Sequence, residues 1–215
     1  VIVVLLAGSA MALSWEDEHV DAILDGFYPG AQGGAAIAEI LFGGANPEGK
    51  LPITFYQTTE ELPEFTDYAM KGRTYRYMEN EALYPFGYGL SYTTYAYGNL
   101  ECVKPFDAQD GITLQVTVTN TGDREGTETL QVYVKAKREG TPNPQLKYVK
   151  KITLKPGESV TEEIHLSPEA FMLYDEKGNF TLEKGAYDIF VGGCQPDARS
   201  AALTGNAPQK LTVTY

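Results

Sequence analysis

Residues 84–95, which read YPFGYGLSYTTY, join two stretches of chain that follow different folding rules. Before this string, apolar segments of strand-like and helix-like character alternate, as in an open, mostly parallel α/β layer. After it come short segments in which apolar and polar residues alternate, as in antiparallel sheets. We therefore predict a partial α/β sandwich with helices over residues 1–98, followed by an all-β immunoglobulin-like sandwich over residues 99–215.

The first stretch predicts the order strand, helix, strand, helix. Residues 1–6 form a β-branched apolar run that is too short to span a bilayer and suits an interior parallel strand covered on both faces. Ser14 is expected to cap a short helix that opens with acidic residues. Residues 20–28 predict a second strand, and residues 35–42 have apolar residues at helical spacing before a glycine pair.

A glycine-rich loop, PGAQGG at residues 29–34, connects the second expected strand to the second expected helix. It has neither the Lys and Ser or Thr of a phosphate-binding P-loop nor the spacing GxGxxG, so it gives no support to nucleotide binding. Its glycines are expected to allow a tight turn. Loops at this end of a strand also line ligand crevices in open α/β sheets, so both roles stay open.

Residues 57–83 have no convincing period and predict a long loop, after a short edge strand at residues 53–56. Aromatic and charged side chains gather in this loop, among them the segment GRTYRY at residues 72–77. A loop of this length is more often functional or interface-forming than idle. We therefore expect it to place side chains over a site.

The second stretch predicts an all-β domain. Its alternating segments are separated by turn sequences such as KPGE at residues 155–158. Among the expected strands are residues 112–119, 129–136, 148–154, 159–166, 186–191 and 210–215. About seven strands over such a length are typical of an immunoglobulin-like or fibronectin type III sandwich. We see no catalytic constellation in this stretch.

The charge of the chain argues against several classes of partner. Its 17 Lys and Arg against 29 Asp and Glu give a formal net charge of −12, which repels phosphate backbones and anionic lipid headgroups. Neither nucleic acid nor a membrane is therefore expected as a partner. A neutral substrate or a protein partner fits better.

Cys102 and Cys194 have neither CxxC spacing nor paired histidines nearby, and His19 and His165 lie far apart in the sequence. No zinc site and no cofactor are therefore expected. Two buried thiols are favoured over a disulfide, because a chain of this size does not need a covalent link. The pairing stays open.

Each of the two stretches contains its own set of short motifs. In the first they are YPG with GG at residues 28–34, LFG with NPEGKLP at residues 41–52, GRTYRY at residues 72–77 and YPFGYGLSY at residues 84–92. In the second they are VTVTNTGD, QVYV, LKPGES and FVGG, which begin at residues 116, 131, 154 and 190. Together these motifs resemble glycoside hydrolase family 3, and the resemblance covers nearly the whole chain.

Members of that family are exo-acting retaining glycosidases, such as β-glucosidases and β-xylosidases. They combine a TIM-like barrel, an α/β sandwich and a fibronectin type III-like domain, and the resemblance implies that this chain holds only the last domain and part of the sandwich. The family's nucleophilic Asp lies in the barrel, and its acid/base Glu usually lies upstream of the first strand expected here. Neither matches a residue of this sequence.

No catalytic residue is therefore assigned, because retaining hydrolysis needs two carboxyl groups about 5–5.5 Å apart. The acidic residues 16–18, together with Asp21 and Asp25, are interpreted as helix-start and solvent-face residues.

Four side chains are candidates for contacts with a sugar: Trp15, Tyr75, Arg76 and Tyr77. Aromatic faces suit the C–H surfaces of a pyranose, and Arg donors suit its hydroxyls. Structural roles compete, because Trp15 near a helix start suits the core and Arg76 could pair with Asp67 or Glu79. If the loop is extended there, Tyr75 and Tyr77 share one strand face, and one packs while the other is free.

These observations predict the C-terminal part of an exo-acting retaining β-glycosidase, with β-glucosides as the first substrate class and β-xylosides as the second. The expected partners are a neutral oligosaccharide or glycoside and the barrel domain, in the same or another chain. The alternative is a noncatalytic carbohydrate-binding or structural module packed on another chain. The sugar, the linkage, the compartment (cytoplasmic or secreted) and the oligomeric state, a homo-oligomer included, stay open.

Overall fold

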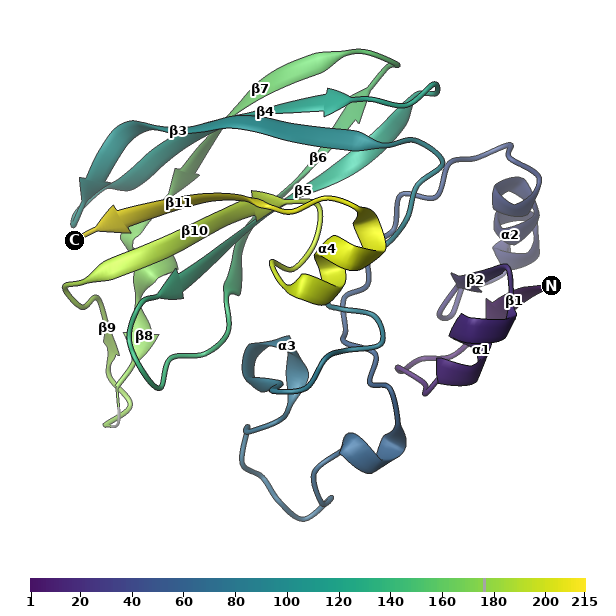
Figure 1. Ribbon diagram of the computed structural model, residues 1–215, viewed down its shortest axis with the longest axis horizontal. Helices are drawn as coiled ribbons and strands as arrows, with labels where there is room; N and C mark the ends of the chain where they lie inside the picture. Colours follow the sequence, from purple (N-terminus) through teal and green to yellow (C-terminus); the bar gives the residue numbers. More distant parts are fainter. Residues whose placement is uncertain (176) are drawn as a thin grey trace. The chain divides into compact units, whose positions relative to one another are not determined.

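The computed structural model describes residues 1–175 and 177–215 and shows two compact units, Val1–Ser91 and Tyr92–Tyr215 (Figure 1). The division lies inside the aromatic string that joins the two stretches. The limit expected at residue 98 lies a few residues later, inside strand β3 (Tyr95–Asp107). Strand pairing accounts for the difference, because Tyr95 is already in register with Asn120.

The first unit has the predicted order of strand, helix, strand and helix. These elements are β1 (Ile2–Leu5), α1 (Ser14–His19), β2 (Ala22–Asp25) and α2 (Gly33–Leu41). The two strands are parallel and in register over their whole length. A small core lies beside them, around Leu13, Phe55 and Leu83.

The apolar side chains of β1 are only partly covered. Ile2 is 50% exposed and Val4 is 36% exposed, while Val3 and Leu5 are half-buried. The residues that the structure describes therefore do not supply the cover expected on both faces of this strand. That cover stays a prediction.

Two local predictions in the first unit are wrong. Ser14 does not cap α1, because it is the first helical residue and its hydroxyl donates to the carbonyl of Gln57 at 2.6 Å. Residues 53–56 form no strand, and a single antiparallel bridge joins Phe55 to Tyr84. Phe55 is instead a buried core residue.

The second unit is a β-sandwich of two sheets, as predicted (Figure 1). Besides β3, its long strands are β4 (Gly111–Asn120), β5 (Gly126–Ala136), β6 (Gln145–Leu154), β7 (Ser159–Leu166), β10 (Ala186–Gly192) and β11 (Gln209–Thr214). One sheet has the order β11-β10-β5-β6 and the other β3-β4-β7, with antiparallel neighbours throughout. Each strand expected from the alternation is present.

Alternation along these strands builds the core of the sandwich. Every second residue of β4 is fully buried, namely Ile112, Leu114, Val116 and Val118. The same period on β10 buries Ile189 and Val191 against them. The intervening residues of β4 face outward, as the pleat of a strand requires.

Sequence analysis missed the smaller elements of this unit: η2 (Pro168–Phe171), β8 (Leu173–Tyr174), β9 (Phe180–Thr181) and α4 (Ala198–Thr204). Signals for α4 were nevertheless present. The Asp197 carboxylate accepts a hydrogen bond from the backbone N–H of Ser200 at 2.6 Å, and Gly205 ends the helix with φ of +70°. These are the usual residue types at the two ends of a helix.

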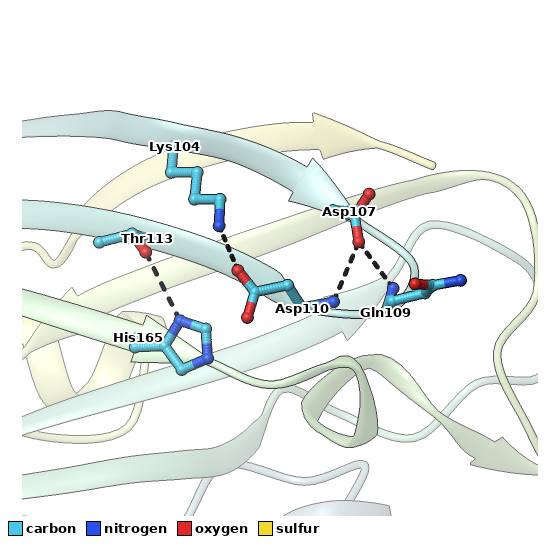
Figure 2. A network of polar contacts seen from close by, with 6 residues as sticks. All are labelled: Lys104, Asp107, Gln109, Asp110, Thr113 and His165. Atoms are coloured by element: carbon cyan, nitrogen blue, oxygen red, sulfur yellow. Dashed lines mark hydrogen bonds and ion pairs between the residues drawn. The ribbon is translucent and has the colours of Figure 1, made fainter.

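A polar network holds the turn between β3 and β4 (Figure 2). The Asp107 carboxylate accepts hydrogen bonds from the backbone N–H groups of Gln109, at 2.8 Å, and Asp110, at 3.0 Å. Lys104 forms an ion pair with the Asp110 carboxylate. Both carboxylates therefore serve the turn itself.

The two cysteines do not pair. Cys102 is exposed on the edge strand β3, and Cys194 is buried. The expectation of buried thiols is thus right for Cys194 and wrong for Cys102, which lies on a strand whose middle residues are mostly exposed.

Candidate functional site

The long loop at residues 57–83 is held together by Arg73. The loop contains two short helical turns, η1 (Thr59–Glu61) and α3 (Thr74–Tyr77), and Arg73 directly precedes the second. Its Nε donates to the carbonyl of Ala69 at 3.0 Å. Its Nη2 donates to the carbonyls of Glu64, at 3.2 Å, and Asp67, at 2.5 Å. The rigid fork of guanidinium donors thus fixes the path of the loop before α3.

Thr74, the first residue of α3, has a φ of +55°. This left-handed conformation is sparsely populated by β-branched residues and persists only where the surroundings enforce it. The Tyr56 hydroxyl supplies part of that enforcement, because it accepts from the Thr74 N–H at 3.1 Å and donates to the Gly72 carbonyl at 3.3 Å. Tyr56 therefore stabilises the turn that leads into α3.

The three candidate residues on α3 have different environments. Tyr75 is buried and its ring stacks on Phe86, with ring centroids 4.2 Å apart. The Arg76 guanidinium lies over the Tyr75 ring, 5.8 Å from its centroid, and the side chain is exposed. Tyr77 is 36% exposed. Arg76 and Tyr77 are therefore accessible, while Tyr75 is packed beneath Arg76.

The segment is a single helical turn rather than extended chain, so the condition for a shared strand face of Tyr75 and Tyr77 is not met. One of the two nevertheless packs and the other is partly exposed, as expected. Arg76 does not pin the loop through Glu79 or Asp67, because the Glu79 carboxylate pairs with Lys71 at 3.6 Å and Asp67 Oδ1 accepts from a backbone N–H. Arg73 takes that role instead.

Trp15 lies in α1 and is 64% exposed, so the expectation that it belongs to the core is wrong. Its ring stacks on His19, one turn along the helix, with centroids 4.5 Å apart and an interplanar angle of 7°. The ring is thus held in one orientation while much of its surface faces outward. Such a surface suits the C–H face of a sugar.

Asp25 departs from its expected solvent-facing role. It ends β2, and its Oδ1 accepts from the backbone N–H of Phe27 at 2.9 Å, while its Oδ2 is buried without a donor among the described residues. Ligand crevices in open α/β sheets lie beyond the carboxyl ends of the strands. The sequence signal that could have marked Asp25 is an acidic residue at the end of a short apolar strand, directly before Gly26.

Other acidic groups near α1 are engaged. Asp17 Oδ1 accepts from the Tyr84 hydroxyl at 2.6 Å. In the part of the chain that the structure describes, no group of three His, Cys, Asp or Glu is arranged to hold a metal ion. The candidate side chains are therefore aromatic rings and one guanidinium on two separate elements, α1 and α3, and no pair of carboxyl groups beside them is assigned to catalysis.

Comparison with known families matches both units. Residues 1–92 match the glycosyl hydrolase family 3 C-terminal domain, and residues 128–195 match a fibronectin type III-like domain. By these two domains the chain belongs to glycosyl hydrolase family 3. The family resemblance of the sequence motifs is thereby confirmed.

Curated relatives point the same way. A xylan 1,4-beta-xylosidase of Xylanibacter ruminicola is 42% identical over 95% of this chain, which corresponds to 24% of that protein. A periplasmic beta-glucosidase of Salmonella typhimurium is 39% identical over 89% of this chain and 27% of that protein. The family 3 chain thus spans about a quarter of the length of these relatives.

A solved structure confirms the fold of the family 3 chain. The β-glucosidase from Erythrobacter marinus superposes with a TM-score of 0.81 and 35% identity, over 99% of this chain and 28% of that one. Among the described residues, none of the helices is long and apolar enough to cross a membrane.

Proposed function

We propose that this chain is the C-terminal part of an exo-acting retaining β-glycosidase that removes terminal non-reducing β-linked sugars from oligosaccharides. β-Glucosides are the first substrate class, and β-xylosides are the second. The order of the two family domains carries the proposal. They follow one another here over the same stretch that aligns with proteins named β-xylosidase and β-glucosidase.

Under this proposal, the two catalytic carboxyl groups come from the barrel and the rest of the α/β domain, in the same or another chain. The part described here contributes sugar contacts from the loop at residues 57–83 and from α1. Arg76 offers donors to hydroxyls, and Tyr77 and Trp15 offer aromatic surface. Tyr75 acts as the packed support beneath Arg76, and Arg73 as a positioning residue.

Intact mass and turnover together test the proposal. The material that contains this chain is weighed under denaturing conditions and assayed on nitrophenyl β-glucoside and nitrophenyl β-xyloside. We expect turnover of one of them only where a polypeptide larger than 23.6 kDa, or a second polypeptide, is present. A lone 23.6 kDa species that hydrolyses either glycoside would overturn the assignment of the carboxyl groups to the remaining enzyme.

The sugar contacts have a separate test in the active enzyme. Arg76→Ala and Tyr77→Ala are expected to raise KM for the preferred glycoside several-fold, with little change in the unfolding midpoint, because both side chains are exposed. Lys71→Ala, in the same loop, is the matched control. An unchanged KM in both variants would remove α3 from the sugar site.

A second candidate function is a noncatalytic carbohydrate-binding or structural module. The exposed apolar side chains of β1 favour a surface that packs on further polypeptide, because soluble monomers rarely expose contiguous apolar patches of this kind. Saccharide binding by the isolated chain, without turnover, would support this reading of the 215 residues.

A further inference from the structure

A hollow lies on the outer face of the four-stranded sheet in the second unit. Its volume is about 700 Å³, within the usual range of small-molecule pockets. The end of β5, the segment after it, the middle of β10 and residues 195–197 line it. None of these residues takes part in the proposed hydrolase site.

The charges that line this hollow balance. Three cations, Lys135, Lys137 and Arg138, stand against three carboxylates, Glu139, Asp188 and Asp197. An anionic ligand would need an excess of cations, and a cationic ligand an excess of carboxylates. Such a lining suits a neutral polar ligand. The equal numbers of positive and negative side chains in the hollow differ from the chain as a whole, whose net charge is −12.

The buried carboxylate of Asp188 organises the floor. It receives hydrogen bonds from Lys210 Nζ at 2.8 Å and from the Thr212 hydroxyl at 2.6 Å, and Lys137 Nζ lies 3.9 Å away. Burial opposes the ionised form, but these bonds and the two ammonium charges outweigh it and lower the pKa of Asp188. The floor therefore stays ionised and fixed at neutral pH.

Two charged side chains at the rim of the hollow can form hydrogen bonds with a ligand. Lys135 lies directly opposite Asp188 in the strand register. The Lys135 ammonium forms no ion pair with the described residues. The Glu139 side chain is exposed in the turn that follows the same strand. One is a donor and the other an acceptor, so a ligand that both donates and accepts can use the two together.

The remaining walls supply an apolar surface and a buried acceptor. Phe190 is half-buried, and Lys210 Nζ lies 5.3 Å from its ring centroid, which restrains the ring. Gln195 Oε1 is buried and has no hydrogen-bond partner among the described residues. A buried acceptor without a donor is costly, so a ligand hydroxyl would be favoured there.

We propose that this hollow is a binding site for a neutral saccharide. A ligand hydroxyl donates to Gln195 Oε1, others engage Lys135 and Glu139, and the C–H face of a pyranose packs on Phe190. Sugars meet these demands together because each hydroxyl both donates and accepts. The site does not depend on the proposed function, since it lies wholly in the sandwich.

The site is tested by titrating the 215-residue chain with cellobiose and with xylobiose. Changes in amide chemical shifts then show which residues lie near the bound disaccharide. We expect shifts at residues 135–139, 188–190 and 195. Phe190→Ala should weaken binding by about tenfold, as expected for loss of an aromatic contact. Phe180→Ala, at another partly exposed phenylalanine of the same unit, is the matched control and should leave the affinity unchanged.

Gln195→Leu is the second variant, because it removes the acceptor without enlarging the hollow. Equal affinity in all variants, or shifts confined to residues 74–77, would overturn the proposal. Tighter binding of glucuronate or glucosamine than of the neutral disaccharides would overturn its neutral-ligand part. If the whole enzyme hydrolyses neither glycoside while this chain still binds the disaccharides at the hollow, the result counts against the proposed function and not against this site.

Discussion

The two units of this chain bury their apolar residues in different ways. The sandwich, residues 92–215, closes a core of fully buried side chains between its two sheets. The first unit, residues 1–91, has a small core and exposes large apolar side chains such as Phe42, Phe65 and Tyr28, each more than 80% exposed. The sandwich is therefore complete by itself, whereas the first unit offers apolar surface for further contacts.

The largest expected effect comes from the closed core. Leu114→Ala should lower the free energy of unfolding of the sandwich by about 2–5 kcal/mol, because it leaves a cavity among fully buried neighbours. Chemical denaturation measures this loss. Phe42→Ala in the first unit removes a larger side chain that is 90% exposed, and it should change stability by less than about 0.5 kcal/mol. Equal losses in the two variants would break the comparison.

A glycine pair sharpens the contrast inside the sandwich. Gly111 has φ of +86°, and a Cβ there would lie 2.0 Å from the Leu166 carbonyl oxygen. Gly140 has φ of +74°, with nothing within 4 Å of the same position. Gly140→Ala should cost roughly 1–2 kcal/mol, from the left-handed backbone alone. Gly111→Ala should cost clearly more, since strand packing must also shift, and thermal unfolding would show a lower Tm.

Equal Tm values for these two alanine variants would mean that the start of β4 relaxes without cost. Such a result would contradict the description of the sandwich as tightly closed at that end.

In the first unit, the expected effect is local. Arg73→Leu removes the hydrogen bonds to the carbonyls of residues 64, 67 and 69 and should destabilise the loop by roughly 1–3 kcal/mol. Hydrogen exchange at residues 64–72 should speed up while the sandwich core stays protected. Arg76→Leu is the control, because its guanidinium lies over a ring and makes no backbone bond in the loop. Slow exchange in the Arg73 variant would contradict the clamp.

The smallest effect concerns pH. A hydrogen bond and the charge of Lys104 lower the pKa of the exposed Asp110 carboxyl. Because the folded pKa lies below the unfolded one, the stabilisation is present at neutral pH and is lost as the pH falls through the lowered value, below about pH 4. A carboxyl titration by NMR should show the shift, and Lys104→Met should abolish it. An ordinary pKa for Asp110 in the unaltered chain would refute the ion pair between Lys104 and Asp110.

Sequence patterns predicted the sandwich well because its core follows a strict period of two, as in β4. They failed where tertiary contacts decide the local structure. The segment around Tyr75 is a helical turn whose first residue, Thr74, has a left-handed φ, and the Thr74 N–H donates to the hydroxyl of Tyr56, eighteen residues earlier in the chain. No local pattern encodes that bond.

The candidate site was partly predictable. Arg76 and Tyr77 were named from residue type, and the structure exposes both. Arg73 was missed because its partners are carbonyl groups, which every residue carries and no motif marks. Gln195 was missed because an orphan acceptor becomes visible only when the surrounding chain is folded.

The way in which Arg73 holds its loop bears on how well this segment tolerates substitution. The guanidinium grips main-chain oxygens at residues 64, 67 and 69, so the shape of this segment is insensitive to which side chains occupy it. Natural variation or directed evolution can therefore sample new side chains at residues 64–69 while the scaffold keeps its geometry. A single arginine thereby holds the path of the segment whatever side chains it carries.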